Sequence, residues 1–170
     1  MNQSINQLNL QNGLNQCDRN EFSATPSIKN GDALRVNQIN CVEVASQELG
    51  FIGSYCAATI ICSTGDDYYR IKYKTLLTDD ESEPLEDVFS ATELRPVPPH
   101  QHEKIPENGF RLYDMVDVFD NDGWWFGFIS ARVGDEYYVY FPTTADNIAY
   151  PPHLLRIHQE WSNGKWIFLP

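Results

Sequence analysis

The chain has 170 residues, and its 24 acidic against 12 basic side chains give a formal net charge of −12. Binding to a nucleic-acid backbone relies on Lys and Arg, so this balance argues against a DNA or RNA partner and favours a cationic one. No run of about 18 apolar residues is present, which argues against a membrane span, and the first residues show no secretory signal. A chain of this length forms one ordinary domain or two small ones.

Residues 1–26 form the first segment, which is rich in Asn and Gln and has Phe22 as its single aromatic residue. Such a composition buries too little apolar surface to offset the ordering entropy of the chain. We therefore predict a flexible N-terminal leader, and we identify no chemistry in it.

Short strands are predicted after this leader. In the first group, residues 42–44, 58–61 and 69–73 have the composition and alternation of strands, and turns rich in Gly and Asp separate them. A Pro-rich stretch follows over residues 95–106, where the prolines disfavour both a helix and a central strand. Strands resume over residues 115–119, 125–129 and 137–141. Because no segment shows a sustained 3.6-residue apolar period, the fold class is all-β. We predict a first unit over residues 27–99, a connector over 100–108 and a second unit with a C-terminal extension over 109–170.

The two strand groups are copies of each other. Residues 42–44 match 116–118, 56–60 match 125–129, 69–73 match 137–141, and Leu94-Arg95 matches Leu155-Arg156. Short strands remove their exposed edges best by closing into a barrel, so the repeat predicts two small tandem β-barrels. Each barrel alone would have a thin core, and we expect the two to pack as one unit. The repeat also aligns Ala58 with Gly127, positions where a larger side chain would collide with the opposite barrel wall.

The cysteines indicate neither a metal site nor a disulfide framework. Cys17 lies in the leader, while Cys41, Cys56 and Cys62 lie in apolar runs, and none has zinc-ligand spacing. We expect the last three to be buried thiols that pack as small hydrophobic side chains, and we predict no metal and no cofactor.

The motifs in these copies resemble the plant Agenet domain, a branch of the Tudor-like royal superfamily. In the first copy the matching segments are Val42-Glu43-Val44, residues 50–60, Tyr73, and residues 76–80, 84–86 and 94–99; in the second they are residues 116–119, 122–127 and 155–161. The resemblance covers residues 28–166 in the tandem order of the family. It implies five-stranded barrels, a nuclear location, binding of methylated histone tails and no catalysis. The best-known tandem pairs of this type bind histone H3 dimethylated at lysine nine, a mark of silenced heterochromatin.

A methyl-lysine reader needs several aromatic rings around one pocket. Methylation removes hydrogen-bond donors from the ammonium ion, which then favours aromatic faces, and a carboxylate takes any remaining N–H group. In the family, these rings come from the end of the first strand, the start of the second and the end of the third. The second copy has Phe119, Trp125 and Phe141 at these positions, so the resemblance predicts a complete cage there, with Asp146 as its acidic partner.

The remaining candidate positions surround this predicted cage. Its rim is predicted to include Asp120, Asp122, Trp124 and Tyr140. Trp124 and Trp125 point to opposite faces of one strand, so Trp124 either packs inside or contacts the rim. In the first copy the cage positions hold Ala45 or Ser46, Cys56 and Tyr73, so a single ring remains and we expect this copy to support the second.

Three further groups are candidates for contacts. The acidic run that contains Asp79, Asp80, Glu81, Glu83 and Glu86 is predicted to hold the basic parts of a histone tail. His153 precedes the last barrel strand and is a candidate pH-sensitive contact, because its protonation would repel a cationic peptide. Trp161 and Trp166 lie beyond the last barrel strand and are predicted to form a lid over the interface between the barrels.

Three alternatives to a methyl-lysine reader remain open. The first is a methyl-independent interaction module for basic proteins, in which the aromatic residues serve as core. The second is nucleic-acid binding, which the net charge opposes. The third is an enzyme, but no catalytic triad motif, G-x-G-x-x-G sequence or P-loop is present. We therefore predict a monomeric tandem domain that binds the histone H3 tail and has neither catalytic activity nor a membrane or nucleic-acid partner.

Overall fold

The computed structural model describes residues 41–99 and 106–168, and within them the chain is built from β-strands and two short 3-10 helices. The predicted all-β class and the two tandem barrels are confirmed. The predicted leader over residues 1–26, and residues 100–105 of the predicted connector, lie outside the described residues.

The first barrel is formed by β1 to β5. Their bounds are β1 Cys41–Val44, β2 Ser54–Gly65, β3 Tyr68–Leu77, β4 Pro84–Ser90 and β5 Leu94–Pro96, with the 3-10 helix η1 over Ala91–Glu93. β2 pairs with β1 and β3, β3 pairs with β4, and β1 pairs with β5, all antiparallel.

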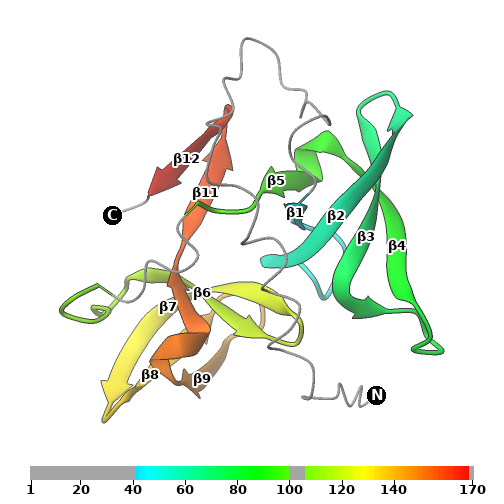
Figure 1. The fold of residues 1–170 in the computed structure, drawn as a ribbon. Coiled ribbons are helices and arrows are strands. Elements are labelled where there is room, and N and C mark those ends of the chain that lie inside the picture. The colour runs from blue at the N-terminus through cyan, green and yellow to red at the C-terminus, as the bar shows by residue number, and fades with distance from the viewer. Residues whose placement is uncertain (1–40, 100–105, 169–170) are drawn as a thin grey trace.

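The second barrel repeats this arrangement. Its elements are β6 Met115–Asp120, β7 Gly123–Val133, β8 Glu136–Phe141, β9 Asp146–Tyr150, η2 Pro152–Leu154 and β10 Leu155–Ile157. β7 pairs with β6 and β8, β8 pairs with β9, and β6 pairs with β10. A hairpin of β11 (Gln159–Ser162) and β12 (Lys165–Phe168) follows, and Figure 1 shows β11 beside β5 of the first barrel.

The two barrels share backbone hydrogen bonding. β2 and β7 pair antiparallel over two residues, Ser54 with Trp125 and Tyr55 with Trp124, so β1–β10 form one ten-stranded sheet. The Phe126 amide also donates to the Gly53 carbonyl at 2.9 Å. The expected packing of the barrels as one unit therefore includes a continuous sheet (Figure 1).

Each barrel has its own apolar core. The first core includes Val42, Val44, Cys56, Ala58, Ile60, Tyr69, Ile71, Tyr73, Phe89 and Leu94. The second includes Phe110, Val116, Val118, Ile129, Tyr137, Val139, Phe141, Tyr150 and Leu155. Many of these residues are related by the repeat, so the same strand alternation builds both cores.

The cysteine prediction holds for one of the three strand cysteines. Cys56 is a free and buried thiol, and burial raises its pKa to about 11. Cys62 is also free, but it is exposed, so the expectation of burial is wrong there. Cys41 is disulfide-bonded, so the expectation of a free thiol is wrong at that position.

Gly127 is expected to tolerate no side chain. A Cβ atom there would lie 2.5 Å from Val139 Cγ1 and 2.9 Å from the Tyr140 carbonyl oxygen. A larger side chain would therefore collide, but with the paired strand β8 and not with the opposite barrel wall that the sequence analysis predicted. We expect Gly127→Ala to lower the free energy of unfolding by about 1–3 kcal/mol, and Gly127→Val by more, in urea titrations. At a strand position without such a collision, replacing glycine with alanine would raise the free energy of unfolding by about 0.5–1 kcal/mol. A higher free energy of unfolding for Gly127→Ala would therefore contradict the prediction.

Candidate functional site

The β6–β7 hairpin organises one end of the second barrel. Its two-residue turn has positive φ angles at Asn121 (44°) and Asp122 (61°), the conformation of a type I′ turn. This tight turn leaves Asp120 paired with Gly123 across the hairpin. The end of β6 and the start of β7 are therefore held together next to the end of the barrel.

Three aromatic residues from three strands gather at this end. Trp125 of β7 is partly buried against the second core, to which Phe141 of β8 and Tyr150 of β9 belong. The rings of Phe141 and Tyr150 meet edge to face, with centroids 6.0 Å apart. Phe141 also packs over Gly127, since its Cδ1 atom lies 3.4 Å from the position of a Cβ there. Trp125 and Gly127 are two residues apart and therefore lie on the same face of β7.

Asp120 connects two of these rings. Its backbone carbonyl accepts a hydrogen bond from Trp125 Nε1 at 2.8 Å, and its side chain accepts one from the Tyr150 hydroxyl at 2.7 Å. Burial raises the pKa of Tyr150, and the hydrogen bond to Asp120 raises it further, so the hydroxyl stays a neutral donor. Asp120 thus fixes the orientation of both rings and places a carboxyl group beside them.

The structure does not bring Phe119 to Trp125, although the sequence analysis grouped them. Phe119 pairs with Trp124, while Trp125 pairs with Val118, so the register places Phe119 and Trp125 on opposite faces. The rings of Phe119 and Trp124 pack together with centroids 5.1 Å apart. Trp124 is buried, and the Arg156 guanidinium lies 4.1 Å from its ring centroid. Of the two roles predicted for Trp124, it therefore packs inside the protein and does not lie on the cage rim.

The other predicted cage and rim residues are divided between two surfaces. Asp146 is exposed and pairs with Phe141, and its charge acts on Tyr150, so it lies at the same end as the three rings. Asp122 lies in the hairpin turn, where partial burial raises the pKa of its carboxyl group. Tyr140 is exposed and lies on the opposite face of β8 from Phe141.

The first barrel lacks one of the corresponding rings. The repeat places Cys56 at the position of Trp125, Tyr73 at that of Phe141 and Phe89 at that of Tyr150. The rings of Tyr73 and Phe89 meet edge to face at 6.3 Å, as in the second barrel. Because Cys56 is a small buried thiol, this barrel retains the inner two rings without an indole at their side.

The predicted acidic run lies in the β3–β4 loop and the start of β4. Thr75, in the preceding strand β3, donates from its hydroxyl to the Asp122 carbonyl at 3.1 Å. Asp80 accepts hydrogen bonds from Thr78 and Ser82, which lower its pKa to about 2. Glu86 lies 3.7 Å from Lys72, and both side chains are exposed. The run is thus an acidic loop that follows the strand whose Thr75 contacts the hairpin of Asp120.

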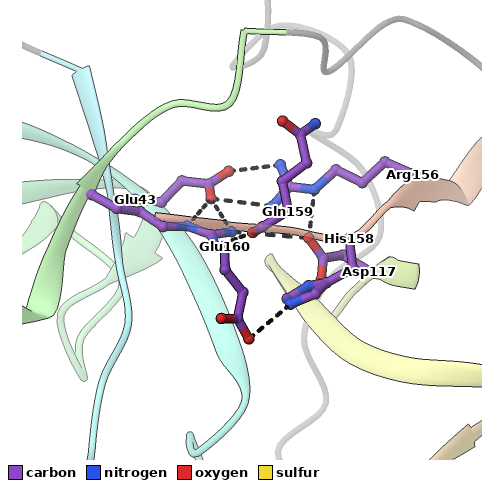
Figure 2. Close-up of polar contacts among 7 residues, drawn as sticks. Glu43, Asp117, Arg156, His158, Gln159 and Glu160 are labelled. Atoms are coloured by element: carbon purple, nitrogen blue, oxygen red, sulfur yellow. Dashed lines mark hydrogen bonds and ion pairs between the residues drawn. The ribbon is translucent and has the colours of Figure 1, made fainter. Parts of the chain in front are cut away.

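A buried charge network fills the interface between the barrels (Figure 2). Glu43 of β1 accepts hydrogen bonds from Arg95 Nε at 2.9 Å and from Arg156 Nη1 at 2.7 Å. Asp117 of β6 accepts one from Arg156 Nε at 2.9 Å, and His158 Nδ1 lies 2.6 Å from its other oxygen. Burial acts to raise the pKa of Asp117, but Arg156, His158 and Arg95 outweigh it and hold that pKa below its usual value. Two carboxylates and two guanidinium groups therefore balance each other across the two barrels.

The remaining predicted residues lie around this interface. Trp161 and Trp166 pair across β11 and β12, with ring centroids 5.2 Å apart, and Trp166 lies 5.3 Å from the Arg95 guanidinium. The predicted lid over the interface is consistent with these contacts. His153 is exposed in η2, and its pH-sensitive role stays a prediction.

Neither a metal site nor a membrane helix is found in the part of the chain that the structure describes. Across residues 41–99 and 106–168, no group of three or more His, Cys, Asp or Glu side chains is arranged to hold a metal ion. No helix in these ranges is long and apolar enough to cross a membrane.

Tyr150 is the aromatic residue of this group that was not predicted from the sequence. Its signal was the repeat offset of 61 residues between Leu94 and Leu155, which also aligns Phe89 with Tyr150. The strand that ends at Tyr150 begins with Asp146 and Asn147, two residue types that are uncommon in strands, so its sequence does not stand out as a strand.

Comparisons with known proteins agree with this architecture. Residues 40–99 match the family model of the Agenet domain. The chain is 35% identical over 127 residues to the Arabidopsis thaliana protein named AGENET DOMAIN (AGD)-CONTAINING P1, covering 74% of this chain and 24% of that protein. It is 33% identical over 141 residues to DUF724 domain-containing protein 3 of Arabidopsis thaliana, covering 79% of this chain and 20% of that protein. It thus spans a quarter or less of these relatives.

Two solved structures have the same tandem arrangement. The crystal structure of Arabidopsis thaliana AGDP1 AGD34 matches with a TM-score of 0.70 and 30% identity, covering 76% of this chain and 87% of that one. The crystal structure of ADCP1 tandem Agenet domain 3-4 matches with a TM-score of 0.66 and 26% identity, covering 77% and 86%.

Proposed function

Because this chain belongs to the Agenet domain family, whose members are protein-interaction modules of a chromatin-associated reader fold, we propose that it binds a methylated lysine of the histone H3 tail in the nucleus. The mark that we assign is lysine nine in its dimethylated form, and the site is the end of the second barrel.

The observation that supports this proposal most is the group formed by Trp125, Phe141, Tyr150 and Asp120. Three aromatic residues from β7, β8 and β9 share one end of the barrel, and Asp120 bonds to two of them. A dimethylammonium group keeps one N–H, so it gains from both the ring faces and a nearby carboxyl oxygen of Asp120 or Asp146. A trimethylammonium group has no N–H, which favours the dimethyl form at this site.

The charge of the surrounding surface supports a basic partner. The chain carries a net charge of −12, and the acidic β3–β4 loop follows β3, the strand whose Thr75 contacts the hairpin that holds Asp120. A histone tail is rich in Lys and Arg, and carboxylates in this loop would attract and orient it, with an affinity that falls as salt is added.

Calorimetric titration with four forms of one H3 peptide tests the proposal. The unmodified, monomethylated, dimethylated and trimethylated forms differ only at lysine nine. We expect the dimethylated peptide to bind at least about tenfold more tightly than the unmodified one, since cation–π contacts to desolvated rings contribute about 1–2 kcal/mol. Equal affinities for all four peptides would contradict the proposal and favour a methyl-independent module for basic proteins.

A further inference from the structure

A surface cavity with a volume of about 180 Å³ lies where the first barrel meets the β11–β12 hairpin. Its lining includes Ala45, Tyr55, Glu93, Arg95, Glu160 and Trp161. It contains none of the residues that form the proposed methyl-lysine site. Two different parts of the fold, the β1–β2–β5 face and β11, therefore build it together.

The comparison of the two copies explains why this cavity exists. In the second barrel, Phe119 follows β6 residue Val118 and packs its ring on Trp124 at 5.1 Å. The repeat places Ala45 at the position of Phe119 and Tyr55 at that of Trp124. A guanidinium covers the ring in both copies, Arg156 at 4.1 Å from the Trp124 centroid and Arg95 at 3.3 Å from the Tyr55 centroid. The two copies differ in one side chain. Phe119 fills the space beside Trp124 in the second barrel, whereas Ala45 leaves the equivalent space beside Tyr55 open in the first.

The unpaired charge around the cavity is negative. Arg95 is 5% exposed, and its donors are used by Glu43 and by the Gln159 carbonyl, so it offers little to a ligand. Glu160 has a side chain that is 55% exposed and lies 3.8 Å from His158 Nε2. Glu93 uses Oε2 to accept hydrogen bonds from Ser90, which leaves Oε1 available. The walls thus combine Trp161 and Tyr55, one face of which Arg95 covers, with two carboxyl groups from different elements.

We propose that this cavity binds an arginine side chain of the same basic tail whose methylated lysine occupies the second barrel, an inference that rests on the proposed function. A guanidinium is flat, stacks on aromatic rings and directs several N–H groups toward carboxylates in one plane. The stacking of Arg95 between Tyr55 and Trp166 shows that the neighbouring rings accept this geometry. A lysine ammonium is more strongly hydrated and cannot make the bidentate contact, so arginine fits better than lysine.

The test replaces each arginine of a dimethylated H3 peptide, one at a time, with citrulline. Citrulline keeps the shape of arginine and removes its charge. We expect one such replacement to weaken binding to the parent protein by about tenfold, because hydrogen bonds to charged groups contribute about 1.5–3 kcal/mol. In the Ala45→Phe variant, where the new ring fills the cavity, the same replacement is expected to have no effect. Glu160→Gln is expected to reduce the citrulline effect in part.

The controls separate this inference from the proposed function. Ala45→Phe introduces the residue that the second barrel carries at the equivalent position, and urea unfolding checks that the variant folds as the parent does. The preference for dimethylated over unmodified peptide should persist in Ala45→Phe, because the proposed cage is untouched.

If that preference is present but no citrulline replacement weakens binding, or if Ala45→Phe keeps the full citrulline effect, the cavity assignment is wrong. If lysine replaces the arginine without loss, the assignment to a guanidinium is wrong. If no methylation preference exists in the parent, the proposed function itself fails.

Discussion

Replacing Trp125 with alanine is expected to weaken binding of the dimethylated H3 peptide by about 30-fold, which removes the preference for the methylated form. The indole is the most accessible of the three rings at this end of the second barrel, and a desolvated cation–π contact is worth about 2 kcal/mol. Calorimetric titration of the dimethylated and unmodified peptides against parent and variant measures the change. Trp125→Phe, which keeps an aromatic face, is expected to lose less.

The matched control is Phe119→Ala. Phe119 is an aromatic residue of the same hairpin, but its ring packs on Trp124, on the face away from Trp125. We expect the Phe119→Ala variant to keep the preference for the methylated peptide, even if its free energy of unfolding is lower than that of the parent. A larger loss of preference in Phe119→Ala than in Trp125→Ala would support the grouping predicted from sequence and contradict the one built on Tyr150. If the parent and Trp125→Ala bind the dimethylated peptide equally well, the assignment of the cage to this site is wrong.

Replacing Glu43 with glutamine is expected to lower the free energy of unfolding by about 3–5 kcal/mol. Glu43 is 1% exposed and accepts hydrogen bonds from both Arg95 and Arg156, so its neutral analogue leaves these two buried guanidinium groups with a single carboxylate, Asp117. Because these bonds join the two barrels, the loss should appear in the unfolding of both. Urea titration measures it, with tryptophan fluorescence reporting on the second barrel and the terminal hairpin, which hold all four Trp residues, and circular dichroism reporting on both barrels.

The control for Glu43 is Glu86→Gln. Glu86 lies 3.7 Å from Lys72, but both side chains are more than 40% exposed. An exposed ion pair contributes about 0–1 kcal/mol, so this variant should unfold at nearly the parent urea concentration. If Glu43→Gln is as stable as Glu86→Gln, the interface network does not hold the barrels together.

The internal repeat made the fold predictable from the sequence. Matching strand segments and the pair Leu94-Arg95 and Leu155-Arg156 predict two copies, and edge closure predicts barrels, which the structure confirms. The small residue at Gly127 was also predictable, because a bent barrel strand leaves no space there. These features depend on local periodicity, which a single sequence shows directly.

The candidate site was less predictable because it depends on register. The placement of Phe119 followed from its position at the end of a strand, but the tight Asn121-Asp122 turn pairs it with Trp124 and turns it away from Trp125. A shift of one residue reverses the face of every side chain, and strand ends are where sequence patterns define register least. The buried network was not predicted either, since Arg95 and Arg156 look like ordinary surface residues until the barrels are placed side by side.

The pairing of β2 with β7 means that the connector between the barrels does not set their spacing. Backbone hydrogen bonds at Tyr55 and Trp124, with the Thr75 contact to Asp122, fix the first barrel against the hairpin that holds Asp120. These contacts also fix the separation between the proposed methyl-lysine site and the proposed arginine cavity. We expect a tandem of this kind to select its ligands by how many residues lie between the two bound side chains, in addition to what those side chains are.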